Sequence, residues 1–108
     1  MSLGKEQEKF SRDLNCLLSE AFRLGFEVRI GEVQRGLEQQ SYYVRTGRSQ
    51  TMNSMHLKKL AADLHFTMDG KLVYPEHLGI FWETLSPQNK AGMFWENFKD
   101  SPHFQRTY

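Results

Sequence analysis

The strongest constraint on the fold is a stretch of alternating side chains that ends in a tight turn. Residues 60–68 alternate between an apolar set and a mixed set that contains Asp63 and His65. Because successive side chains of a strand point to opposite faces, we expect a buried apolar face and an open face. Asp69-Gly70 favours a two-residue hairpin turn, with residues 72–74 as the return strand. The expected apolar face consists of Leu60, Ala62, Leu64, Phe66 and Met68.

Three other segments have the periodicity of amphipathic helices. Apolar residues recur at steps of three and four along residues 10–22, and Gly25 is placed to end that helix. A second helix is predicted over Leu37–Arg45, with Gly47 as its cap. A third is predicted to begin at Pro75 and to end at Ser86-Pro87.

Two shorter segments complete the expected order of elements. Residues 26–30 alternate and predict a half-buried strand that runs on towards Gln34. The aromatic-rich residues 93–104 are interpreted as a short strand or loop that closes the sheet. The order α-β-α-β-β-α-β predicts an α+β fold, with helices packed against a small antiparallel sheet. A chain of 108 residues is expected to form a single domain over residues 1–108.

Composition and charge exclude several classes of protein. The single cysteine, Cys16, rules out a disulfide scaffold, and we expect it to be a small buried hydrophobe on the first helix. The net charge of +1 argues against a nucleic-acid partner. No apolar run approaches the ~18 residues of a membrane span, so membrane insertion is not expected. The polar N-terminal residues lack the apolar core of a signal peptide, which predicts a cytoplasmic protein.

Four residues form a candidate metal site with a base. Asp63 is expected on the open face of its strand, shortly after the loop residue His56. His103 in the C-terminal segment supplies a third ligand, and catalytic zinc takes three protein ligands plus an open position. Asp100, three residues before His103, is the candidate base. The alternative is that both histidines are surface residues and that Asp63 is a solvated carboxylate. His65, on the same strand face, is interpreted as a bystander or as a support for the site.

Two segments carry a resemblance to a known family. Ser54-Met55-His56-Leu57-Lys58-Lys59-Leu60-Ala61-Ala62-Asp63 resembles the SxHxxGxAxD signature of the zinc D-Ala-D-Ala carboxypeptidase and L-alanyl-D-glutamate endopeptidase family. Asp100-Ser101-Pro102-His103-Phe104-Gln105 resembles its second signature, DxxHxE. A looser match is Gln34-Arg35-Gly36, followed by Gln39 or Gln40 and by Tyr43, which resembles the arginine segment of that family. The matches run in the family's order, and the short enzymes of phages and prophages are the most similar group.

The resemblance implies roles for individual residues. It implies three zinc ligands, His56, Asp63 and His103. Asp100 would be the general base that activates water. Arg35 would bind the substrate and stabilise the oxyanion, a role that suits a fixed guanidinium. Ser54 would contact the substrate or orient the site. The implied fold is that of the Hedgehog and D-Ala-D-Ala peptidases.

Three departures from the family pattern affect the expected site. Lys59 stands where the family has glycine, so we expect the turn after His56 to be built differently. Gln105 replaces the glutamate of the second signature and would support the His103 ring less than a carboxylate does. The family's Trp-Gly-Gly segment is here Met93-Phe94-Trp95-Glu96.

The resemblance implies a monomeric zinc peptidase that hydrolyses peptidoglycan stem peptides. The L-Ala-D-Glu endopeptidase activity is favoured over the D-Ala-D-Ala carboxypeptidase activity. Such an enzyme would resemble a phage endolysin, which acts on the cell wall after release from the cytoplasm. The alternative function is a non-catalytic metal- or cell-wall-binding domain that retains the peptidase fold, and the Lys59 and Gln105 departures would be its mark.

Overall fold

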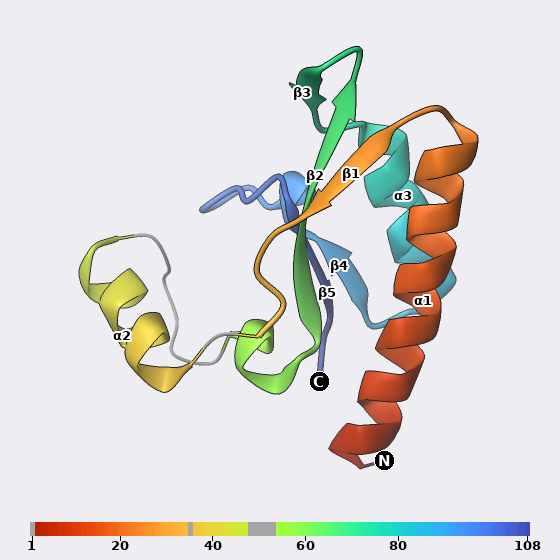
Figure 1. The fold of residues 1–108 in the computed structure, drawn as a ribbon. Coiled ribbons are helices and arrows are strands. Elements are labelled where there is room, and N and C mark those ends of the chain that lie inside the picture. Colours follow the sequence, from red (N-terminus) through yellow and green to blue (C-terminus); the bar gives the residue numbers. More distant parts are fainter. Residues whose placement is uncertain (1, 35, 48–53) are drawn as a thin grey trace.

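One central strand organises the protein, and a computed structural model describes residues 2–34, 36–47 and 54–108 (Figure 1). This strand, β2 (Ala61–Met68), begins beside β5 (His103–Arg106) and ends beside β3 (Lys71–Val73). β1 (Glu27–Ile30) pairs with residues 64–67 of β2, and β4 (Asn89–Ala91) pairs with β5. Every pairing is antiparallel, and the main path of the sheet runs β1-β2-β5-β4. The predicted α+β class is confirmed.

The helices lie on both sides of this sheet. α1 (Leu3–Arg23) and α3 (Glu76–Leu85) pack together against one side, and α2 (Leu37–Arg45) lies on the other (Figure 1). The short 3₁₀ helices η1 (Met55–Lys58) and η2 (Gly92–Phe94) precede β2 and follow β4. Among the described residues, no helix combines the length and apolar character that a membrane crossing requires.

Trp82 of α3 lies at the centre of the core. Its fully buried ring meets Phe10 of α1 edge-on at 5.7 Å between centroids and Phe104 of β5 at 6.0 Å. Its indole N–H donates a hydrogen bond to the Gln105 carbonyl at 3.0 Å, which satisfies the polar atom of a buried ring. The predicted apolar face of β2 packs against this cluster, except Met68, which is exposed beside the turn that ends the strand.

The predicted turns are present, and glycines carry the backbone conformations that they require. Asp69 and Gly70 both have positive φ, 51° and 77°, as a two-residue hairpin of this type demands. Gly25 (φ 93°) follows α1, and Gly47 (φ 78°) follows α2. At these positions a left-handed residue lets the chain leave a helix without steric cost.

Several boundaries differ from the prediction. β1 ends at Ile30 rather than Gln34, and Ile30 is exposed at the end of this edge strand. β5 begins at His103, near the end of the segment predicted over residues 93–104, and β4 precedes that segment, where no strand was expected. The prediction that Cys16 is buried is wrong. Cys16 is exposed, because it lies about 100° around α1 from the buried Leu17.

A buried ion pair joins the two ends of the described chain. The Arg106 guanidinium of β5 donates a hydrogen bond to the Glu6 carboxylate of α1, and both side chains are buried. Next to it, the Gln7 side chain donates to the Lys58 carbonyl of η1 at 2.8 Å. The first turns of α1 thus fix the positions of β5 and η1, the elements that carry two of the candidate site residues.

Replacing Glu6 with alanine should strongly destabilise the fold. The Glu6→Ala variant leaves the Arg106 charge buried without its partner, and such a change costs about 3–5 kcal/mol. Glu8→Ala is the matched control, because Glu8 is exposed on the same helix and its ion pair is with the exposed Lys5. Urea unfolding of both variants would measure the difference. Equal unfolding midpoints for the two variants would contradict this role of the buried pair.

Candidate metal centre

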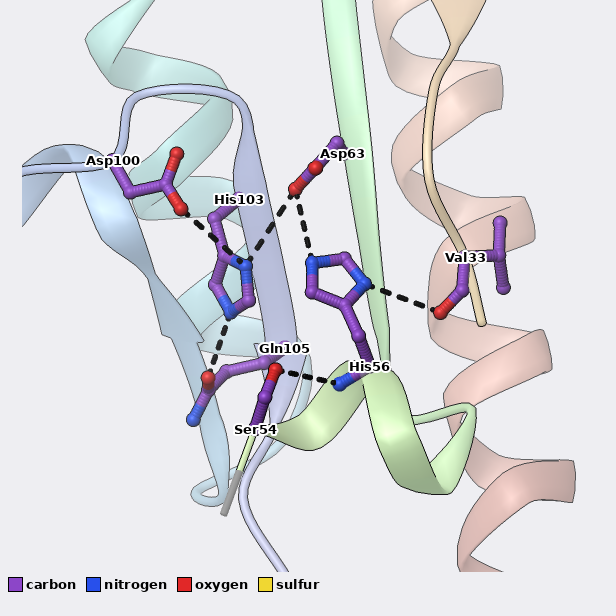
Figure 2. A network of polar contacts seen from close by, with 7 residues as sticks. All are labelled: Val33, Ser54, His56, Asp63, Asp100, His103 and Gln105. Atoms are coloured by element: carbon purple, nitrogen blue, oxygen red, sulfur yellow. Dashed lines mark hydrogen bonds and ion pairs between the residues drawn. The ribbon is translucent and has the colours of Figure 1, made fainter. Parts of the chain in front are cut away.

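The register of two paired strands places Asp63 beside His103. β2 and β5 are antiparallel, and these two residues lie directly opposite each other. Side chains in such a pair have Cβ atoms about 4.5–5.5 Å apart on the same face of the sheet. The His103 Nδ1 atom lies 3.6 Å from the Asp63 Oδ1 atom (Figure 2).

The 3₁₀ helix η1 brings His56 to the same point. Ser54 is the N-cap of η1, and its hydroxyl accepts a hydrogen bond from the His56 backbone N–H at 3.2 Å. The His56 ring is buried, and its Nε2 atom lies 3.2 Å from Asp63 Oδ1. One nitrogen from each histidine and one Asp63 oxygen all lie within 4.8 Å of one another. The Ser54 hydroxyl therefore caps the turn that carries His56.

Hydrogen bonds on the far side of each ring set the histidine tautomers. The His56 Nδ1–H donates to the Val33 carbonyl at 3.2 Å, since a carbonyl oxygen can only accept. The His103 Nε2–H donates to Gln105 Oε1 at 2.7 Å, while the Gln105 amide N–H donates to Thr107. The remaining nitrogens, His56 Nε2 and His103 Nδ1, therefore direct lone pairs towards Asp63 (Figure 2).

This arrangement leaves polar atoms that a cation would satisfy. His56 Nε2 and Asp63 Oδ1 are buried, and neither has a hydrogen-bond partner within the described ranges. Two facing lone pairs repel each other in a buried site, whereas a metal ion between them would accept both. With bonds of usual length, a tetrahedral zinc ion holds its ligand atoms about 3.3 Å apart. The two separations to Asp63 Oδ1 are 3.2 and 3.6 Å, and all three atoms lie within 4.8 Å of one another, so the donor set suits such an ion.

Asp63 is ionised, as a metal ligand has to be. Burial alone raises the pKa of its carboxyl group. When the facing nitrogens of His103 and His56 carry protons, their hydrogen bonds and positive charge outweigh burial and hold that pKa well below its usual range. In the tautomers described above, a cation would take the place of those protons and keep Asp63 ionised.

Asp100 lies at the edge of the cluster, and Gly92 positions it. The Asp100 Oδ2 atom is 3.8 Å from His103 Nδ1, and its side chain is 39% exposed. The Asp100 backbone N–H donates to the Gly92 carbonyl at 3.0 Å. A Cβ atom on residue 92 would lie only 2.3 Å from the Asp100 carbonyl oxygen, so only glycine fits there. Sequence reasoning missed Gly92, because this close approach joins segments with no local pattern.

The structure shows how Lys59 and Gln105, which depart from the family pattern, are accommodated near the candidate ligands. Lys59 has φ 57° and ψ 38°, the left-handed conformation that glycine adopts most easily. The lysine takes up this conformation at a cost of about 1–2 kcal/mol, so the turn after His56 forms without glycine. Gln105 accepts the His103 N–H in the way that a glutamate would.

Other residues considered in the sequence lie around the cluster or apart from it. Arg35 lies outside the described residues. His65 is not in the cluster, and its Nδ1 atom lies 3.2 Å from the Tyr74 hydroxyl. The half-buried Trp95 has its ring 5.1 Å from the His103 ring and borders the site.

The comparison with known proteins shows what this architecture is similar to. No family model matches the sequence, and none of the curated proteins does. A crystal structure of the L-Ala D-Glu endopeptidase ChiX from Serratia marcescens is similar, with a TM-score of 0.68 and 24% sequence identity. The similarity covers 98% of this chain and 89% of that chain. The two chains share a fold.

Removing one histidine of the cluster should abolish metal binding. Loss of a residue that only hydrogen-bonds to a metal ligand costs roughly 10–100-fold in metal affinity. Because His56→Ala removes a ligand itself, it should weaken zinc binding by more than that. His65→Ala is the matched control, since His65 lies two residues from Asp63 but outside the cluster. Native mass spectrometry and zinc titration would give the stoichiometry and affinity. We expect one zinc ion per chain in the unmodified protein and in the control, and unchanged affinity in His56→Ala would contradict this assignment.

Proposed function

We propose that this protein is a zinc-dependent peptidase that hydrolyses the L-Ala–D-Glu bond of peptidoglycan stem peptides. The observation that carries the proposal is the His56, Asp63 and His103 cluster with Asp100 at its edge. Support for the substrate comes from the shared fold with an L-Ala D-Glu endopeptidase and from the two sequence signatures. The same signatures favour a phage endolysin role and place D-Ala-D-Ala carboxypeptidase activity second.

The chemistry divides between the metal and the side chains. Bound zinc would lower the pKa of water to about 7 and polarise the scissile carbonyl. Asp100 then accepts a proton from the attacking water and passes it to the amine nitrogen as the C–N bond breaks. Its exposed side chain can reach substrate and water, while its short distance to His103 keeps it at the reacting centre.

Ser54, Val33 and Gln105 act through the histidines. Ser54 caps the turn that carries His56, and the Val33 carbonyl fixes the tautomer of that ring. Gln105 does the same for His103. These contacts hold both rings in place before a substrate arrives, which lowers the reorganisation needed during the reaction.

Arg35 completes the proposed machinery. A guanidinium presents planar, paired N–H donors, which suit a carboxylate or a developing oxyanion. Arg35 lies two residues after Val33 in the sequence, and the Val33 carbonyl accepts the hydrogen bond from the His56 ring. The proposal assigns Arg35 to substrate binding and oxyanion stabilisation on the strength of the sequence resemblance.

The alternative of a non-catalytic binding domain has less support. It relied on Lys59 and Gln105 as signs of a degraded site. Lys59 preserves the turn conformation, and Gln105 preserves the hydrogen bond to His103. Neither departure disturbs the cluster, so catalysis is the better interpretation.

Digestion of purified peptidoglycan tests this function. We expect the protein to release new N-terminal D-Glu ends, and we expect a chelator to abolish the cleavage and added zinc to restore it. Mass spectrometry of the fragments identifies the bond. New termini between the two D-Ala residues would instead assign the carboxypeptidase activity. Bound zinc without any cleavage would establish the binding domain.

Replacing Asp100 with asparagine should separate catalysis from metal binding. Asp100→Asn keeps the size of the side chain but removes its basicity, so kcat should fall on the order of 10²–10⁴-fold with zinc affinity retained. Asp69→Asn is the control, because Asn-Gly forms the same kind of hairpin turn at the exposed end of β2. Full stem-peptide cleavage by Asp100→Asn would remove this residue from the mechanism.

A further inference from the structure

A hollow of about 390 Å³ opens beside the residue that follows Asp100 in the chain. It is lined by Tyr74, Glu76, Met93, Phe94, Lys99 and Ser101. Ser101 directly follows Asp100, so the hollow begins one residue, about 3.8 Å along the chain, from the proposed base. A substrate whose scissile bond lies at Asp100 would extend past this hollow.

A polar pair on the sheet links the hollow to the cluster. His65 and Asp63 lie on the same face of β2, two residues apart. The His65 ring contacts the hydroxyl of Tyr74, and Tyr74 is part of the hollow's lining. Through this contact, a residue on the same strand face as Asp63 touches the lining of the hollow.

The lining of the hollow contains two opposite charges that are not paired with other described residues. Glu76 and Lys99 are both exposed, and in the part of the chain that the structure describes neither forms an ion pair. Glu76 lies in the first turn of α3, where the helix dipole favours a carboxylate. Met93 and Phe94 supply apolar surface to the same lining. The lining therefore suits a ligand with an aliphatic stem, an ammonium and a carboxylate.

We infer that this hollow binds the free end of a diamino diacid in the substrate. The inference rests on the proposed function, because in stem peptides only D-Glu separates the cleaved bond from a diamino residue. Glu76 would contact the ammonium group and Lys99 the carboxylate. Where that residue is lysine, the side chain carries the ammonium alone, and Lys99 has no partner. The hollow thus selects stem peptides that contain the diamino diacid.

Two tripeptides that differ by one carboxylate test this selection. They are L-Ala-γ-D-Glu-meso-diaminopimelate and L-Ala-γ-D-Glu-L-Lys. The unmodified protein should cleave the first with a kcat/KM about fivefold higher, the size of an exposed ion pair. Lys99→Met should remove this preference. Glu76→Gln should lower kcat/KM on both peptides by similar factors, because both carry the ammonium.

Lys9→Met is the matched control, since Lys9 is exposed on α1 and far in sequence from the hollow. It should leave the preference intact, and thermal unfolding should show that all variants are folded. Equal cleavage of both peptides by the unmodified protein, or an equal loss on both in Lys99→Met, would overturn this inference and leave the proposed function standing. Cleavage of neither peptide would overturn the proposed function and this inference with it.

Discussion

The antiparallel pairing of β2 with β5 supports both the core and the candidate site. In this register Asp63 lies opposite His103, and Ala62 lies opposite Phe104. The first pair lies on the open face, and the second is fully buried against the helices. A slip of one residue would move His103 into the core and Phe104 into solvent. The hydrophobic effect that buries Phe104 therefore also positions two of the candidate metal ligands.

Elements that are long enough to repeat their pattern of apolar and polar residues several times could be predicted from the sequence. α2 has the predicted bounds, and the alternation of β2 correctly separated Asp63 from the buried Leu64. β4 and η1, with three and four residues, are too short to show any period. Their conformations depend on pairing with β5 and on capping by Ser54, which are tertiary and local contacts rather than patterns of polarity.

The candidate site also has one part that could be predicted from the sequence and one part that could not. Its ionisable side chains could be found from their types and spacing. The groups that hold them in place include the carbonyl of Val33, and every residue has a carbonyl. Gly92 is needed because the Asp100 backbone lies against it, and Lys59 adopts a conformation that its side chain gives no sign of. Such backbone requirements become visible only when distant segments are placed together.

The position of Trp95 makes its fluorescence a possible readout of the candidate metal cluster. The chain has two tryptophans, and the other, Trp82, is sealed in the core. The Trp95 ring is half-buried and 5.1 Å from His103, so its fluorescence is sensitive to the charge on that imidazole and to any ion held there. Trp82 emission would stay constant as an internal reference. Occupancy of the cluster could then be followed in real time in an unlabelled protein.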